Sequence, residues 1–202
     1  MPISDPAREP FATPEARSAA GLWGMWLFII VIAMVFVATM LAYLVVRLGT
    51  GDESGWRPEG SPGLPRELIL STLLLAASSW TMQRSLVASR ANHDDRAVTS
   101  AWATFALGWA FVAVQGLGWS QMWRALPLQD SLYAWTFYVL TALHALHVIG
   151  GLAAMHLVIM RVVRSHDHRE VVLGLTKCTM YWHTLGVIWI ALYATLWVGS
   201  FD

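Results

Sequence analysis

Four histidines stand in long apolar segments of the sequence, where an ionisable side chain is unusual. His144 and His147 are three residues apart, so on a helix they share one face, and both lie near the middle of the apolar segment 131–160. With His156 and His183 as further ligands, such imidazoles could bind a haem or a metal ion. We favour the alternative, that each ring stays neutral and hydrogen-bonds to a neighbouring helix, because no carboxylate accompanies the histidines.

The expected depth of His183 also argues against a shared site. Its apolar segment is expected to begin near residue 178, which places His183 about one and a half turns inside a membrane, shallower than His144 or His147. Outside these segments, the sequence shows no Gly-rich phosphate loop and no Ser-His-Asp arrangement on a nucleophile turn. The single cysteine, Cys178, cannot form an internal disulfide and is expected to be a small apolar filler.

The composition indicates a membrane protein. Of 202 residues, 56% are hydrophobic and only 13% are charged, and the mean hydropathy is +0.52. The charged residues are confined to short stretches between apolar segments, so a soluble domain would lack its polar coat. Twelve tryptophans, many of them near the ends of these segments, are typical of membrane interfaces. The formal net charge of zero argues against a nucleic-acid partner.

The apolar segments predict an all-α integral membrane bundle of five transmembrane helices. Backbone groups in lipid must be hydrogen-bonded within the segment, and these segments are too long for barrel strands. Residues 1–20 are expected to form a flexible tail rich in proline, and residues 21–202 the membrane domain. The second segment is the shortest and the richest in hydroxyl side chains. The expected spans are 21–46, 68–83, 97–123, 131–160 and 178–199.

The distribution of basic residues predicts the orientation of the bundle. Nine Lys and Arg residues fall on the side of the N-terminal tail and four on the other side. The positive-inside rule then places the N-terminus in the cytoplasm and the C-terminus in the periplasm. The nine are Arg8, Arg17, Arg84, Arg90, Arg96, Arg161, Arg164, Arg169 and Lys177, and the four are Arg47, Arg57, Arg66 and Arg124.

Four stretches, in order along the chain, resemble subunit III of the haem-copper terminal oxidases, the cytochrome c and quinol oxidases, in the five-helix bacterial form. Residues 24–29 read GMWLFI and residues 78–83 read SSWTMQ, with the serine pair and threonine of the family. Residues 144–151, HALHVIGG, are similar to its two-histidine and glycine segment. The tyrosine, tryptophan and histidine at 181–183, followed by VIW at 187–189, are the most specific part of the resemblance.

The sequence departs from the family pattern at three acidic positions. The membrane glutamate that is usual in the first of these helices is matched here by Ile32, and a second acidic position in the third helix is matched by Gly118. In the last helix, Gly186 stands where an aspartate commonly follows the tryptophan-histidine pair. The resemblance therefore extends to the scaffold but not to its carboxylates, so a role in proton uptake is not expected to carry over.

The resemblance implies a non-catalytic subunit of an aerobic respiratory oxidase in a bacterial inner membrane. Such a chain has no catalytic residue, haem or metal of its own, stabilises the catalytic subunit I next to subunit II, and encloses structural phospholipids. Haem and copper belong to the catalytic subunit. The side chains expected to pack or to line the lipid cleft are His144, His147, His183, Trp182, Arg161 and Arg164, the two arginines as contacts for lipid phosphate.

Two alternatives stay open at this point. The accessory protein of nitric oxide reductases resembles subunit III and has the same five-helix plan, and the missing carboxylates do not exclude it. A self-contained haem-binding membrane cytochrome that uses His144, His147, His156 and His183 belongs to a different class. A Soret band on the isolated polypeptide would distinguish the cytochrome from the two subunit hypotheses, and the chemistry of the partner would distinguish oxygen from nitric oxide reduction.

Overall fold

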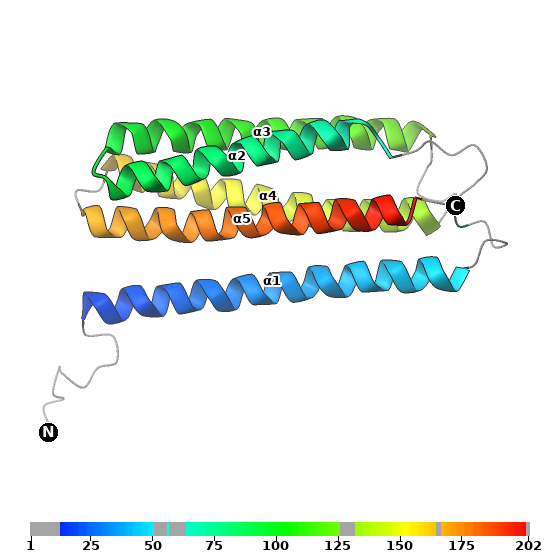
Figure 1. Cartoon of the computed structure of the whole chain (residues 1–202), viewed down its shortest axis with the longest axis horizontal. Coiled ribbons are helices and arrows are strands. Elements are labelled where there is room, and N and C mark those ends of the chain that lie inside the picture. The colour runs from blue at the N-terminus through cyan, green and yellow to red at the C-terminus, as the bar shows by residue number, and fades with distance from the viewer. Residues whose placement is uncertain (1–12, 51–55, 57–63, 126–131, 165–166, 201–202) are drawn as a thin grey trace, which may run out of the picture.

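The protein is a bundle of long helices, as a computed structural model describes it for residues 13–50, 56, 64–125, 132–164 and 167–200. The predicted all-α class is confirmed, with five helices in the described residues (Figure 1). Of the expected flexible tail, residues 1–12 lie outside these ranges, and residues 14–20 belong to the first helix. The helices are α1 (Pro14–Thr50), α2 (Glu67–Arg90), α3 (Asp94–Ala125), α4 (Leu132–Arg164) and α5 (His168–Val198).

The helices extend beyond the apolar segments because polar residues cap them. Oγ1 of Thr13 accepts a hydrogen bond from the backbone N–H of Ala16, and Pro14 occupies the first helical position of α1. Oδ1 of Asp167 accepts the N–H groups of Arg169 and Glu170 at the start of α5. Helix α5 therefore begins at His168, ten residues before the expected span that starts at 178.

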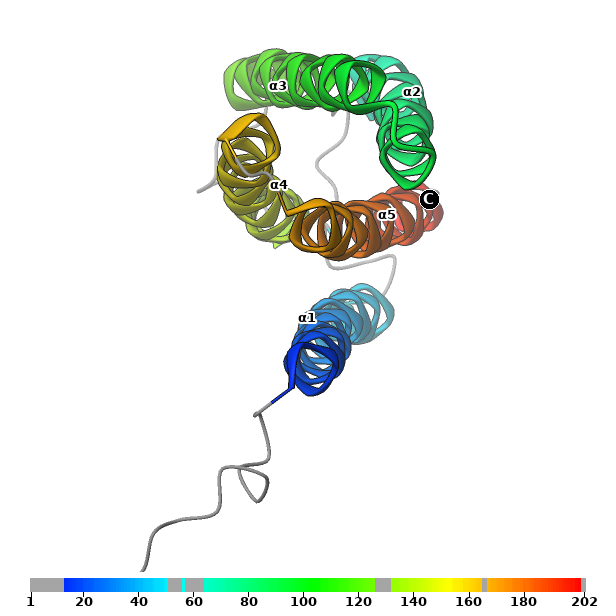
Figure 2. The ribbon, with the colours of Figure 1, turned by 90° about the vertical axis from the view of Figure 1, so that its left-hand side faces the viewer.

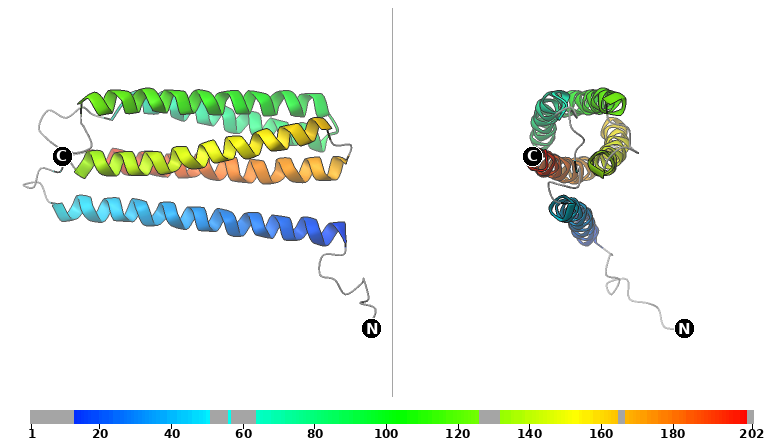
Figure 3. Two further views of the ribbon diagram at one scale, coloured as in Figure 1. Left: turned by 180° about the vertical axis from the view of Figure 1, so that it is seen from behind. Right: turned by 90° about the vertical axis from the view of Figure 1, so that its right-hand side faces the viewer.

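Four of the helices surround a common core and α1 packs outside them. In the end-on views, α2, α3, α4 and α5 form a ring, with α1 lying against the side that carries α5 (Figures 2 and 3). Helix α1 contacts mainly α5 and to a lesser extent α4. A tight turn at Asn92, in the left-handed region with φ of 58°, reverses the chain between α2 and α3. The helices α2, α3, α4 and α5 therefore have an up-and-down order.

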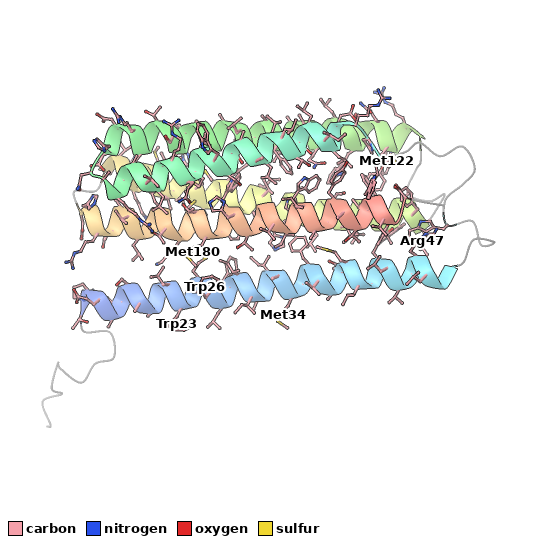
Figure 4. The ribbon with its side chains drawn as sticks, viewed as in Figure 1. Trp23, Trp26, Met34, Arg47, Met122 and Met180 are labelled. Carbon is pink, nitrogen blue, oxygen red and sulfur yellow. The ribbon has the colours of Figure 1, made fainter. Side chains whose placement is uncertain are left out.

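The helices α1, α3 and α5 begin at one end of the bundle, where α2 and α4 terminate (Figure 1). We call this the basic end, because it carries a concentration of arginines: Arg90, Arg96, Arg161, Arg164 and Arg169. On the outer side of α1, Trp23 and Met34 point away from the other helices, and their side chains are largely exposed (Figure 4). Such exposed apolar side chains suit a surface that faces lipid.

Four helices, all except α2, are long and apolar enough to cross a membrane by length and composition. Helix α2 does not reach this level because serines occupy its buried face: Ser71, Ser78, Ser85 and Ser89 are each fully buried. Its exposed face carries Ile69, Leu70, Leu73, Trp80 and Val87. The averaged hydropathy of α2 is therefore low even though its outward side chains are mostly apolar.

The core of the four-helix ring is held by tryptophans that hydrogen-bond to hydroxyls of α2. Nε1 of Trp182 donates to Oγ of Ser78 over 3.0 Å, and Nε1 of Trp189 donates to Oγ1 of Thr72 over 3.0 Å. Both tryptophans are 1% exposed. Because a buried N–H without a partner costs on the order of 1–3 kcal/mol, the α2 hydroxyls satisfy polar groups that lipid could not.

Candidate functional site

A cavity of about 720 Å³ lies between α1 and the pair formed by α4 and α5. Its lining is mostly apolar side chains and includes Gly150 and Gly151. Of the histidines, His147 lines it. The cavity is partly open and its lining is mostly apolar, which suits an acyl chain better than a polar metabolite. It is the main candidate site that the described residues form.

Close packing of α4 against α5 shapes the floor of this cavity. A Cβ atom placed on Gly151 would lie 2.7 Å from Cε1 of Tyr181, so only glycine allows this approach. Oη of Tyr181 donates a hydrogen bond to the backbone carbonyl of His147 over 2.9 Å, and the Tyr181 ring stacks on Phe28 of α1 with centroids 5.9 Å apart. Gly151 of the sequence motif therefore sets the distance between α4 and α5, whereas a Cβ on Gly150 would meet no atom within 4 Å.

Charged side chains gather where the cavity approaches the basic end. Arg161 of α4 lines it together with Glu170 and Lys177 of α5, and the Lys177 ammonium lies against Gly21 of α1. Sequence reasoning missed Lys177 as a site residue, because it was expected in the loop before a span beginning at 178. The site residue Arg164 was expected beside Arg161, yet it does not line the cavity and lies exposed in the last turn of α4.

His144 lies in the interior of the bundle rather than in the cavity. Its side chain is 1% exposed and contacts the rings of Phe36, Phe111 and Trp189, with centroids 6.0, 5.9 and 5.1 Å away. Neither ring nitrogen has a hydrogen-bond partner among the described residues. The His144 ring therefore fills space in the core. Among the described residues, no hydrogen-bond partner faces its two nitrogens.

His183 lies farther inside its helix than the expected start at residue 178 implies. His183 is the middle residue of α5, and His144 and His147 lie within four residues of the middle of α4, which corresponds to about 6 Å. The contact of Tyr181 with His147 joins the two helices at this level. The reason is the early start of α5 at the Asp167 cap, which adds about three turns before the apolar segment.

The structure does not bring the histidines together, because they face different neighbours. Nδ1 of His147 lies 2.7 Å from the carbonyl oxygen of Leu143, whereas His183 turns outward to Gln83 of α2. His156 contacts the rings of Trp102 and Phe105 on α3. Within the described part of the chain, no three His, Cys, Asp or Glu side chains are grouped so that they could hold a metal ion.

The three positions that carry acidic residues in the family, Ile32, Gly118 and Gly186, are buried between helices here. Ile32 is 4% exposed and belongs to the core between α1 and its neighbours. A Cβ on Gly186 would lie 3.5 Å from Oγ of Ser79, and a Cβ on Gly118 would lie 3.8 Å from Cβ of Glu67. The described part of α1 has its acidic side chain at Glu15, in the first turn at the basic end.

The absence of a carboxylate from residues 21–46 leads to a chemical prediction. A hydrophobic carbodiimide modifies buried carboxyl groups, so we expect no labelled peptide from residues 21–46 of α1, where the sequence has no Asp or Glu. Peptide mass spectrometry after labelling in membranes measures this. The Ile32→Glu variant is the matched positive control and should gain label at that one position. Label within residues 21–46 of the unmodified protein would contradict the match of Ile32 to the acidic position.

Comparison with known proteins gives a consistent result along nearly the whole chain. The family model described as cytochrome c oxidase subunit III matches residues 14–200. A protein of Synechocystis sp. named cytochrome c oxidase subunit 3 is 32% identical over 183 residues, covering 88% of this chain and 75% of its own length. Proteins of the same name from Coturnix japonica and Gallus gallus are each 31% identical over 183 residues, covering 88% of this chain and 69% of their own length.

Proposed function

The chain belongs to the cytochrome c oxidase subunit III family, and on this basis we propose that it is the non-catalytic subunit of a respiratory haem-copper oxidase. The match of the family model to residues 14–200 carries the proposal. In the proposed complex, the partner subunits I and II contain the haem and copper and reduce oxygen. This chain stabilises subunit I and supplies a lipid-holding surface.

We place the complex in a bacterial inner membrane with the basic end in the cytoplasm. The arginines of that end support this orientation, because basic residues are retained on the cytoplasmic side. We also propose that α2 crosses the membrane with the other four helices. Two features of α2 support this proposal. The helix has 24 residues and is therefore about 36 Å long, and its exposed face is mostly apolar.

We propose that the cavity between α1, α4 and α5 holds a structural phospholipid. The apolar walls suit an acyl chain, and Arg161 and Lys177 at the basic end suit the phosphate of a headgroup. Glu170 in the same place suits the ammonium of an ethanolamine headgroup. His147 then lines the region of the acyl chain, and His144, His183 and Trp182 act through helix packing rather than through lipid contact.

Removal of both cations is expected to release this lipid. The double variant Arg161→Ala with Lys177→Ala should lose about one tightly bound phospholipid per complex, because each charge-assisted hydrogen bond to phosphate contributes roughly 1.5–3 kcal/mol. Native mass spectrometry of the purified complex counts the retained lipids. Arg124→Ala, at the other end of the bundle, is the matched control. An unchanged lipid count in the double variant would contradict the proposed phosphate contact.

Activity of the purified complex tests the proposed chemistry. The chain is tagged, extracted from its native membrane in mild detergent, and the complex that accompanies it is supplied with reduced cytochrome c or a quinol. We expect consumption of oxygen that cyanide inhibits. Consumption of nitric oxide without oxygen reduction would instead identify the accessory protein of a nitric oxide reductase and overturn the proposed reaction.

A further inference from the structure

Among the described residues of the connection between α1 and α2, Trp56 is buried in the bundle. Its side chain is 5% exposed although it belongs to no helix. The last residues of α1 and the first residues of α2 lie at the end of the bundle opposite the basic end, which we call the far end (Figure 1). A tryptophan at a membrane interface usually keeps its polar tip in contact with water or headgroups. The burial of Trp56 therefore indicates that protein groups satisfy its side chain.

Trp56 contacts α1, α4 and the end of α5 at once. Its ring meets Tyr43 of α1 and Tyr133 of α4 edge to face, with centroids 5.5 and 5.8 Å away. Nε1 of Trp56 donates a hydrogen bond over 3.2 Å to the carbonyl oxygen of Gly199, which follows the last residue of α5. The guanidinium of Arg47, labelled at the far end of α1 in Figure 4, lies 5.8 Å from the centre of the indole. One side chain thus joins three helices.

The junction at the far end has no room for a side chain at position 199. A Cβ atom on Gly199 would overlap the ring of Tyr43, which is 2% exposed. Gly199 has an ordinary φ of −72°, so the requirement for glycine comes from the close approach of Tyr43 and not from the backbone conformation. Tyr43 of α1 therefore packs directly on the backbone at the end of α5, and Trp56 hydrogen-bonds to the same residue.

Helix α1 depends on such a junction because it packs outside the four-helix ring. It contacts mainly α5 and to a lesser extent α4, and its opposite face is exposed. Its middle meets the four-helix ring through aromatic contacts: Phe28 stacks on Tyr181, and Phe36 meets His147 with centroids 5.2 Å apart. An element with fewer buried contacts opens more readily than the helices that share the core. The contacts of Trp56 therefore bear directly on the position of α1.

We propose that Trp56 is a positioning residue that holds the far end of α1 against α4 and α5, and so keeps α1 in place as one wall of the lipid cavity. Met25 and Phe28 of α1 line that cavity, so a displacement of α1 would open it. The inference rests on the proposed function where it concerns the lipid. The position of α1 can be measured whether or not the cavity holds one.

Two other roles fit Trp56 less well. An interfacial anchor presents its indole to lipid headgroups, whereas the Trp56 side chain is buried and its N–H is bonded to protein. A direct lipid contact would place Trp56 in the lining of the cavity, and it is not among the lining residues. Trp56 therefore acts on the cavity through α1.

Spin labels measure the position of α1 in the purified complex. In a Cys178→Ala background, cysteines that carry nitroxide labels replace Leu48 of α1 and Leu132 of α4, both exposed at the far end. A second pair of labels, at Trp109 of α3 and Val187 of α5, reports on the four-helix ring alone. Pulsed electron paramagnetic resonance gives the distance distribution of each pair. We expect one narrow distribution for each pair when Trp56 is present.

Substitution of Trp56 is expected to move α1 and leave the four-helix ring unchanged. Trp56→Ala should add a longer and broader distance to the far-end pair only. Trp56→Phe keeps the two edge-to-face contacts and lacks the N–H, so it should recover most of the narrow distribution. Gly199→Ala should displace α1 although Trp56 is intact, because its Cβ would meet the Tyr43 ring. Trp123→Ala, at an exposed tryptophan of the far end, is the matched control and should change neither pair.

Two results of the spin-label experiment would overturn the proposal. An unchanged far-end distance in Trp56→Ala would show that α1 is held without Trp56. Equal broadening of both pairs in Trp56→Ala and in Trp56→Phe would show that Trp56 stabilises the bundle as a whole and does not position α1.

Lipid retention provides the second readout. In native mass spectrometry, Trp56→Ala should lose the phospholipid that the double variant Arg161→Ala with Lys177→Ala loses, although both cations are present, and Trp56→Phe should retain it. A displaced α1 with an unchanged lipid count would overturn the link between Trp56 and the cavity. The proposed lipid site fails in a different way: the unmodified complex would then carry no phospholipid that depends on Arg161 and Lys177. The spin-label distances would still decide whether Trp56 holds α1.

Discussion

Replacing Trp182 by alanine is expected to destabilise the bundle by about 3–5 kcal/mol, the range for truncation of a large buried aromatic side chain. The ring is 1% exposed and packs so closely on α3 that a Cβ on Gly108 would lie 2.9 Å from its Cη2 atom. Alanine would leave a cavity at the junction of α2, α3 and α5. It would also remove the hydrogen bond to Ser78 that joins α5 to α2.

Thermal unfolding in detergent measures this loss, with circular dichroism as the signal. Trp182→Phe fills most of the space but lacks the N–H, so a smaller loss of about 1–2 kcal/mol is expected. Trp109→Ala is the matched control, because the Trp109 side chain is 46% exposed on the outer side of α3. Equal losses in Trp182→Ala and Trp109→Ala would show that Trp182 does not hold the core.

Substitution of His144 is expected to separate a packing role from a ligand role. His144→Ala should destabilise the chain by about 2–4 kcal/mol and lower the yield of complex, because the ring fills the space between Phe36, Phe111 and Trp189. His144→Leu should recover most of that loss. Both ring nitrogens lack partners among the described residues, so an apolar side chain of similar size leaves no group newly unpaired.

Haem content distinguishes the two roles, because a residue that only packs the core does not change the haem bound by each assembled catalytic subunit. For His144→Ala, and equally for His147→Ala, the amount of complex should fall while the haem per assembled catalytic subunit stays the same. The pyridine haemochrome spectrum, divided by the amount of catalytic subunit, measures this ratio. If His144→Leu were as damaging as His144→Ala and haem were lost in proportion, His144 would be a ligand and the packing account would be wrong.

The sequence alone predicts the fold class and most of the helices, because long apolar segments between short charged loops allow few other structures. It does not predict the start of α5. Residues 168–177 are polar enough to read as a loop, and only the Asp167 cap and the packing of Val171 and Leu175 show that they are helical. This one boundary decides both how far His183 lies from the start of α5 and the location of Lys177 at the cavity between α1, α4 and α5.

The direction in which a side chain points is the second thing that the sequence leaves open. Spacing shows that His144 and His147 share a side of α4, yet one lies buried in the bundle and the other lines the cavity. Arg161 and Arg164 are likewise three residues apart, and only Arg161 lines the cavity. Residues on one helix face can still meet different neighbours, so the tertiary packing decides which of them lines the cavity.

The central claim is that the chemistry resides on a partner of this chain, and the location of haem tests it most directly. The tagged chain is purified with its native partner, the absorption spectrum is recorded, and the subunits are then dissociated and measured separately. The account predicts a haem-bearing complex with a larger multi-span partner, and no Soret band on this chain after dissociation. A Soret band that stays with the isolated chain would contradict the account and make the protein a cytochrome in its own right.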